Sequence, residues 1–233
     1  MEFPAPLVTG RLIRRYKRFL ADVELDTGEM VTAHCANPGS MMGLNDPGNP
    51  VWLSQSDNPN RKLKYSWELL SVDGAMVGIN TAHPNRLVEE AISGGIISEL
   101  AGYGAMRREV KYGKNSRIDI LLSDENRPDC YVEVKNVHLL RQPRLAEFPD
   151  SVTTRGAKHL VELSDMVAEG KRAVMVYLVQ RDDADEFAFA RDIDPGYGDA
   201  FDLARKAGVE AIAYRCRLSP SEIVVTEPVP IRL

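Results

Sequence analysis

The chain has 233 residues, of which 44% are hydrophobic and 27% charged, a composition that excludes a disordered, collagenous or disulfide-scaffold chain. Its formal net charge of -5 argues at first against a nucleic-acid partner, because neutralising phosphate requires a basic surface. Eight acids and only two bases lie between Arg181 and Asp202, however, so the rest of the chain carries a balance of +1. We therefore expect a polarised molecule whose acidic segment faces away from any nucleic acid.

Three cysteines, without a C-x-x-C pair, predict a reduced, cytoplasmic compartment. The first ten residues lack the basic patch and apolar core of a secretory signal. No apolar run approaches the roughly 18 residues that a membrane span requires. The sequence therefore predicts a cytoplasmic protein without a membrane partner.

The first part of the chain, to about residue 82, has the pattern of short strands. Residues 19–26 alternate at period two, and Asp73-Gly74 is a two-residue hairpin turn. The expected strands are 19–26, 30–35, 51–54, 65–72 and 75–80. Five or six short strands in about 80 residues predict a small, nearly closed β-barrel such as an OB-fold.

From residue 83 onward, helical and strand patterns alternate. Asn85 is a candidate N-cap for a helix with apolar residues at helical spacing up to Leu100, although Gly94-Gly95 weakens its middle. Further helices are expected at 151–169 and 198–207, and strands at 106–112, 117–122, 130–137, 173–180 and 209–216. This order implies an α/β domain with a central mixed sheet flanked by helices. Together with the preceding β-barrel, it makes the fold class of the whole chain mixed α+β.

The predicted hairpin of residues 117–135 brings charged residues together. If the hairpin is symmetric about Asn126, Asp119 lies opposite Glu133, and Lys135 shares their face because side chains alternate along a strand. Directly opposed residues have Cβ atoms roughly 5 Å apart, so like charges there repel each other, and a hard divalent cation offsets that repulsion. Such a cation could polarise a phosphoryl oxygen and acidify water, while Lys135 stabilises developing charge. A solvated strand face carrying ordinary charge pairs explains the same spacing.

Basic residues form two clusters in the first part, each with aromatic neighbours. They are Arg11, Arg14, Arg15, Lys17 and Arg18 around Tyr16 and Phe19, and Arg61, Lys62 and Lys64 beside Tyr65 and Trp67. Binding of a single strand on an OB-fold surface requires such basic and aromatic side chains, although a run of basic residues is often only a solvent-exposed face of the protein.

Other candidate phosphate contacts lie in a loop and on a helix. The loop beginning Asn37-Pro38-Gly39 offers backbone N–H groups to phosphate, or is a plain turn. Arg155 and Lys158, three residues apart on one helix, share a face that could hold a nucleic-acid backbone or be simply solvated. For His138 and His159 the sequence favours hydrogen-bonded structural roles.

Asp119, followed after thirteen residues by Glu133-Val134-Lys135 in a helix-strand-strand-strand-helix-strand order, resembles the PD-(D/E)xK core of restriction-endonuclease-like nucleases. The chain as a whole resembles the sugar fermentation stimulation protein A family. The segments that carry this second resemblance are 14–22, 34–41, 116–119, 129–135 and 148–159. It implies an OB-like domain at 1–82, a restriction-endonuclease-like domain at 83–233, DNA binding, and a regulatory role in sugar, particularly maltose, metabolism.

The nuclease resemblance also implies roles for residues. Asp119 and Glu133 would bind Mg²⁺ or Mn²⁺ together with the carbonyl of Val134, and Lys135 would be the catalytic lysine. Many such nucleases add a Glu from the first helix, for which Glu90 is the preferred candidate over Glu89, although an exposed helical Glu explains either residue.

Three functions remain open from the sequence. The first is a Mg²⁺-dependent phosphodiesterase acting on DNA, and the second is a non-catalytic transcriptional regulator that uses the nuclease fold as a DNA-binding surface. The third is a structural module that does not bind DNA. Neither the strandedness of the DNA nor the oligomeric state, a homodimer included, follows from the sequence.

Overall fold

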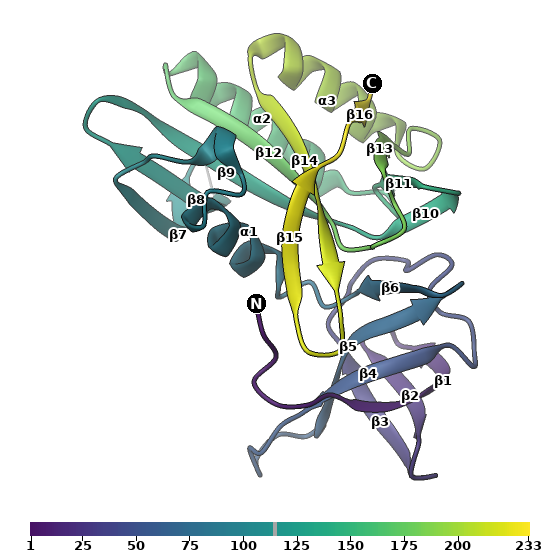
Figure 1. The fold of residues 1–233 in the computed structure, drawn as a ribbon. Helices are drawn as coiled ribbons and strands as arrows, with labels where there is room; N and C mark the ends of the chain where they lie inside the picture. The colour runs from purple at the N-terminus through teal and green to yellow at the C-terminus, as the bar shows by residue number, and fades with distance from the viewer. Residues whose placement is uncertain (114–115) are drawn as a thin grey trace.

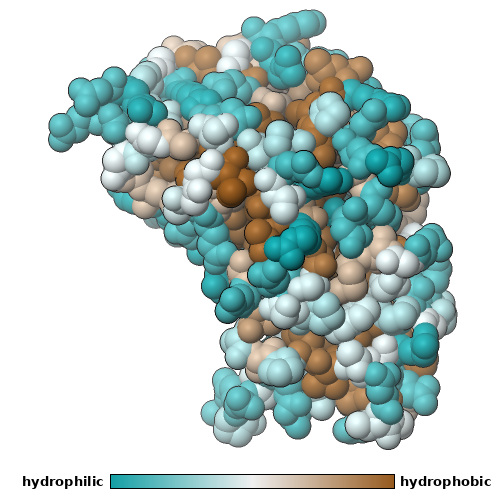
Figure 2. Space-filling model, in the orientation of Figure 1, coloured by the Kyte–Doolittle hydropathy of each residue, from teal (hydrophilic) through white to brown (hydrophobic). Residues whose placement is uncertain are grey.

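The computed structural model describes residues 1–113 and 116–233. Figure 1 shows a β-barrel, drawn in purple and blue, beside a larger α/β part drawn in teal, green and yellow. Figure 2, in the same orientation, shows the surface narrowing where the two parts meet. Within the described ranges, no helix is long and apolar enough to cross a membrane.

The barrel closes through one long-range strand pair. Its strands are β1 (Val8–Tyr16), β2 (Leu20–Leu25), β3 (Met30–Cys35), β4 (Pro50–Gln55), β5 (Tyr65–Val72) and β6 (Ala75–Gly78). They run in the order β3-β2-β1-β4-β5-β6, and parallel pairing of β3 with β5 closes the first five into a barrel. Asp73 and Gly74 both have positive φ, 52° and 84°, as the predicted two-residue turn between β5 and β6 requires. The OB-type barrel is thus confirmed.

β1 lies in the region where the sequence predicts strands, but the sequence did not define its bounds. Leu12 is completely buried, but the strand is otherwise mostly polar or glycine, so its apolar alternation is weak. Gly10 allows β2 to approach closely, since a Cβ at this position would lie 2.5 Å from the carbonyl oxygen of Glu24. The first basic cluster therefore lies on a barrel strand and its following turn.

The second part is built on a six-stranded mixed sheet in the order β15-β14-β12-β9-β8-β7. Its strands are β7 (Ala105–Tyr112), β8 (Ser116–Asp124), β9 (Arg127–Val137), β12 (Arg172–Val179), β14 (Glu210–Leu218) and β15 (Ile223–Pro228). The central strands β9, β12 and β14 are parallel, and the others pair antiparallel. The predicted α/β domain with a central mixed sheet is confirmed.

Helices cover both faces of this sheet, with α1 (Pro84–Ser93) on one side and α2 (Thr154–Ala168) and α3 (Pro195–Ala207) together on the other (Figure 1). On β12, Val174 and Val176 pack toward α1, whereas Met175 and Tyr177 pack toward α2 and α3. All four side chains are completely buried. This explains why β12 is a continuous apolar run instead of an alternating one.

A second, four-stranded sheet was not predicted. It contains β10 (Leu139–Gln142), β11 (Leu145–Phe148), β13 (Glu186–Phe189) and β16 (Ile231–Arg232) in the order β10-β11-β13-β16. No strand in it exceeds four residues, which is too short for a period-two pattern to be visible. Through Phe187 and Phe189 it joins the core beneath α2 and α3.

The helix boundaries differ from the expected ones at their amino-terminal ends. α1 has His83, not Asn85, at its N-cap, with Pro84 as its first residue, and a separate short turn, η1 (Ser98–Leu100), follows it. α2 begins three residues later than expected because the Thr153 side chain accepts the N–H of Gly156. α3 begins three residues earlier than expected and is capped by Asp194.

Candidate functional site

The β8–β9 hairpin positions the candidate site. Ile120 pairs with Val132, and this register, continued by one residue, places Asp119 opposite Glu133 as the sequence predicted. Lys135 Nζ lies 2.7 Å from Glu133 Oε1, so Lys135 and Glu133 share a face of the sheet. The antiparallel pairing therefore brings together the three charged residues on which the sequence prediction centred.

These residues lie in a cleft with a volume of about 470 Å³ that both parts of the molecule line. The barrel side contributes Asn37, Pro38, Gly39 and Thr81. The α/β part contributes Pro84, Asn85, Asp119, Glu133–Asn136, His138, Phe148–Thr153, Arg155 and His159. The acidic segment 181–202 does not line this cleft, in agreement with the expected polarity of the molecule.

Asp119 is held at both carboxylate oxygens. The Asn85 side chain donates a hydrogen bond of 2.8 Å to Oδ1, and the backbone N–H of Val134 donates one of 2.8 Å to Oδ2. Burial, followed by the negative charge of Glu133, raises the pKa of Asp119 despite these bonds. A neighbouring cation would relieve this unfavourable environment.

Glu133 is only 2% exposed, and its two oxygens have different surroundings. Oε1 accepts hydrogen bonds from Lys135 Nζ and from Nδ1 of His159. Oε2 is buried and has no hydrogen-bond partner among the described residues. Burial alone would raise the pKa of Glu133, but the Lys135 charge and the His159 hydrogen bond outweigh it and lower the pKa. Glu133 is therefore an anion with one unused buried oxygen.

The chemistry of this donor set fits a hard divalent cation. Over residues 1–113 and 116–233, no group of three or more His, Cys, Asp or Glu side chains is arranged to hold a metal ion. Mg²⁺ is usually bound by one or two carboxylates, with water and substrate phosphate completing its shell, so two carboxylates suffice. The unpartnered Oε2 of Glu133 and the repulsion between Glu133 and Asp119 are the features that such a cation would satisfy.

The structure does not bring Glu90 to the cleft. Its carboxylate contacts the amino terminus of Met1 at 2.7 Å and Arg86 at 2.8 Å. Only the first turn of α1 reaches the cleft, and there Asn85 contacts Asp119. The candidate glutamate from the first helix is thus replaced at the site by an amide that the sequence analysis assigned to a cap.

Arg155 and Lys158 have different surroundings despite their shared helix. Arg155 lines the cleft, and its Nε donates to Nε2 of His159 at 3.3 Å. Lys158 lies 3.5 Å from Glu162 and does not line the cleft. Of this predicted pair, the geometry supports phosphate contact for Arg155 alone.

The loop Asn37-Pro38-Gly39 lines the cleft, but its polar groups are used within the protein. The Asn37 side chain donates to the carbonyl of Ile79 and accepts the N–H of Gly39, both at 2.9 Å. Arg15, expected to contact DNA, instead donates to the carbonyls of Asn37, Gly39 and Ser40. For these three candidates the structure shows a loop-building role, because their hydrogen-bonding groups are already partnered.

Most other predicted nucleic-acid contacts are on the surface of the barrel. Arg14 pairs with Asp22, and Arg61 donates to Ser66. The side chains of Lys17, Arg18, Lys62 and Lys64 are exposed. Phe19 lies against His34, but it is 43% exposed, and this exposed part of the ring is available for base stacking.

The sequence did not predict that two histidines and an aspartate lie in the wall of the cleft. His159 and His138 are hydrogen-bonded, as expected, but both line the cleft beside the predicted carboxylates. His138 Nε2 lies 3.2 Å from Asp150 Oδ2. Burial would raise the pKa of Asp150, but the His138 interactions and the N–H of Met41 lower it to about 2.

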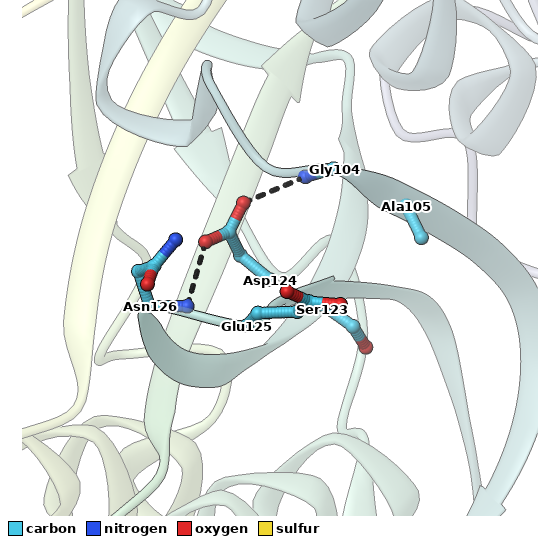
Figure 3. A pocket seen from close by; sticks show the side chains of 6 residues that line it. All are labelled: Gly104, Ala105, Ser123, Asp124, Glu125 and Asn126. Atoms are coloured by element: carbon cyan, nitrogen blue, oxygen red, sulfur yellow. Dashed lines mark hydrogen bonds between the residues drawn. The ribbon is translucent and has the colours of Figure 1, made fainter.

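A second hollow, of about 580 Å³, lies at the β8–β9 turn (Figure 3). Asp124 accepts the N–H groups of Gly104 at 3.1 Å and Asn126 at 2.9 Å. These bonds close the turn, and neither Asp119 nor Glu133 lines this hollow. Its polar groups serve the turn, so the cleft is the candidate site.

Comparison with known proteins agrees with this architecture. A family model described as "Sugar fermentation stimulation protein RE domain" matches residues 82–222, and one described as "SfsA N-terminal OB domain" matches residues 13–79. A sugar fermentation stimulation protein homolog from Maricaulis maris is 56% identical over 233 residues, covering 100% of this chain and 99% of that protein. One from Rhodospirillum centenum is 62% identical over 223 residues, or 96% of each chain. The solved structure of Pyrococcus furiosus SfsA in complex with Ca²⁺ has a TM-score of 0.89 and 26% identity, covering 100% of this chain and 98% of that one. The chain therefore belongs to the sugar fermentation stimulation protein family.

Proposed function

We propose that this protein binds nucleic acid, DNA in the first instance, and hydrolyses phosphodiester bonds with Mg²⁺ or Mn²⁺ at Asp119, Glu133 and Lys135. The observation that carries this proposal is the unpartnered, buried Oε2 of Glu133, which lies in a cleft together with a second carboxylate and a lysine. Two carboxylates in a purely phosphate-binding cleft would repel the ligand, whereas a bound divalent cation would convert that repulsion into attraction.

The related Pyrococcus furiosus protein was solved with Ca²⁺, which supports a divalent cation in this family. A bound divalent cation would supply Lewis acidity, polarising a phosphoryl oxygen and lowering the pKa of attacking water. Asp119 and Glu133 would hold the cation. The ammonium group of Lys135, now on Oε1 of Glu133, neutralises charge that develops on the phosphate during attack. Arg155, at the cleft wall, binds an adjacent phosphate.

The barrel contributes binding instead of chemistry. Lys17, Arg18, Lys62 and Lys64 provide exposed positive charge, and Phe19 provides an exposed ring. Single-strand binding by OB-folds has two components, namely basic side chains that follow the phosphate backbone and aromatic side chains that stack on nucleobases. A strand lying on the barrel can continue into the cleft, since the loop 37–39 lines the cleft from the barrel side.

One observation favours a second function, a non-catalytic DNA-binding regulator of sugar metabolism. Both oxygens of Asp119 already have protein donors, Asn85 and the N–H of Val134, so this carboxylate is satisfied without a cation. A nuclease fold that has become a binding surface would keep such internal bonds.

The deciding experiment incubates purified protein with single- and double-stranded DNA and RNA in Mg²⁺ or Mn²⁺. Asp119→Asn and Lys135→Ala are expected to lower cleavage by about 100-fold or more. Asp129→Asn and Lys171→Ala are matched controls, because these two residues form a 3.5 Å ion pair outside the cleft, and they should retain cleavage.

The alternatives give different results in the same assay. No cleavage, with binding that weakens steeply as salt rises, supports the regulator. Cleavage that survives both Asp119→Asn and Lys135→Ala would exclude this site as its source. If neither nucleic acid binds at low salt, both functions are wrong.

A further inference from the structure

We infer that His159 is a positioning residue that orients Glu133 so that its Oε2 faces the divalent cation, an inference that rests on the proposed function. His159 lies on α2 and Glu133 on β9, 26 residues apart in the chain. Their side chains meet in the wall of the cleft, where His159 is 4% exposed and Glu133 2% exposed. The contact joins Nδ1 of the imidazole to Oε1 of the carboxylate.

The surroundings of His159 determine which ring nitrogen carries the proton. Arg155 Nε donates to Nε2 of His159 at 3.3 Å. Because an arginine only donates, Nε2 must accept, and the imidazole proton is therefore on Nδ1. His159 consequently donates to Glu133, and Arg155 fixes the tautomer that makes this possible.

This donation decides how the two oxygens of Glu133 are used. Oε1 accepts from both His159 and Lys135, whereas Oε2 is buried without a partner among the described residues. With Lys135 alone, the carboxylate could rotate and offer either oxygen to the ammonium group. The second donor, His159 on α2, fixes the rotamer of Glu133 and keeps Oε2 directed away from Lys135.

A purely structural histidine would leave this arrangement unexplained. A buried acceptor without a partner costs free energy, and a network built only for stability would satisfy both oxygens of Glu133. Residues that hydrogen-bond to a metal ligand typically change cation affinity by 10- to 100-fold when they are replaced. His159 has this relationship to Glu133, and its effect should therefore appear in cation binding itself.

Three substitutions of His159 separate the effect of losing the hydrogen-bond donor from the effect of changing the side-chain volume. In His159→Asn the amide nitrogen can occupy the position of Nδ1 and still donate to Glu133. In His159→Gln the amide nitrogen lies near the position of Nε2, and His159→Ala has no donor. Cation binding is measured by titration calorimetry with Mn²⁺ and with Ca²⁺ on the full-length protein without nucleic acid, and thermal unfolding checks the fold.

We expect His159→Gln and His159→Ala to weaken cation binding by about 10- to 100-fold, and His159→Asn to stay within about threefold of the wild type. In cleavage assays, the first two should lower kcat more than they raise KM for nucleic acid. Wild-type affinity in all three variants, or equal loss in all three while they remain folded, would overturn the inference.

Three further outcomes are distinguishable. If His159→Gln and His159→Ala unfold at the assay temperature, His159→Asn alone decides: retained binding supports the donor role, and a tenfold loss contradicts it. If the wild-type protein binds neither cation, the proposed function itself is wrong. If the wild type binds and the variants bind equally well, only the role of His159 is wrong.

Discussion

Asp150, in the α/β part, accepts a 2.9 Å hydrogen bond from the backbone N–H of Met41, in the barrel. The hydroxyl of Ser40 also donates to the carbonyl of Asp150, at 2.6 Å, and His138 contacts its carboxylate. Asp150 and His138 both line the cleft. One acidic residue therefore connects the two parts of the molecule directly beside the candidate site, so the shape of the cleft depends on this contact.

Gly39→Ala should weaken the contact between the two parts. A Cβ at residue 39 would lie 2.5 Å from Oδ2 and 2.7 Å from Oδ1 of Asp150, closer than real Cβ atoms approach other atoms. To make room, Asp150 must move away from Met41 and His138. We expect the free energy of unfolding to fall by about 1–3 kcal/mol, the cost of disrupting a hydrogen-bonded, partly buried group, measured by urea denaturation.

Gly196→Ala is the matched control for this change. Its Cβ would lie 3.5 Å from Oδ1 of Asp194, an ordinary contact, within the first turn of α3. This variant should be as stable as the wild type or slightly more stable. Equal stability of Gly39→Ala and Gly196→Ala would show that Asp150 gives way without cost.

The Asp150 contact should depend on pH. Its pKa is lowered from 3.8 to about 2, because hydrogen bonding and charge at His138 and the N–H of Met41 outweigh burial. A carboxyl with a lowered native pKa contributes stability that is fully present above 3.8 and is lost as the pH falls toward 2. The contribution is about 2 kcal/mol. Urea unfolding at pH 5, 4, 3 and 2 should show a difference between wild type and Asp150→Asn that shrinks over this range, and a constant difference would contradict it.

Arg155→Ala should weaken nucleic-acid binding more than Lys158→Ala does. Arg155 lines the cleft, whereas Lys158 points toward Glu162. In an Asp119→Asn background, which prevents cleavage, loss of the arginine should lower the affinity for nucleic acid about tenfold. It should also lower the magnitude of the slope of log affinity against log salt concentration by about one. Lys158→Ala should change the affinity by less than about twofold. If both changes weaken binding equally, phosphate contacts the outer face of α2 instead of the cleft.

The sequence predicts the geometry at the centre of the candidate site, because the information there is local. A short hairpin and strict alternation of side chains are enough to place Asp119 opposite Glu133 and Lys135 on the same face. The same holds for β12, whose continuous apolar run correctly indicates burial on both faces. These features depend on neighbours in the chain or on a single strand.

The contacts that complete the site depend on how a helix is placed against the sheet, and no local pattern encodes that. Glu90 failed as a candidate because only the first turn of α1, with Asn85, reaches the cleft. His159 meets Glu133 from 26 residues away. A signal was nevertheless present, since His159 directly precedes the buried Leu160 on the apolar side of its helix, and a buried imidazole needs a polar partner.

Arg15→Ala should destabilise the protein, whereas Lys62→Ala should affect only binding. The Arg15 guanidinium donates to the carbonyls of Arg18, Asn37, Gly39 and Ser40. Removing it takes one donor from each, and of the four only Ser40 has a further side-chain donor among the described residues, Asn45. We expect a loss of about 1–3 kcal/mol in the free energy of unfolding, and Arg15→Lys should not restore it, because one ammonium group cannot span the four carbonyls.

Lys62 is exposed, so Lys62→Ala should change stability by less than about 0.5 kcal/mol. It should nevertheless weaken binding equally to nucleic acids of different sequence, because a lysine that contacts phosphate interacts with the charge of the backbone and not with the bases. The slope of log affinity against log salt concentration should fall in magnitude by about one. Urea denaturation and salt-dependent binding of both variants separate the two roles. Wild-type stability in Arg15→Ala, together with a loss of binding equal to that of Lys62→Ala, would return Arg15 to the nucleic-acid surface on which the basic cluster first placed it.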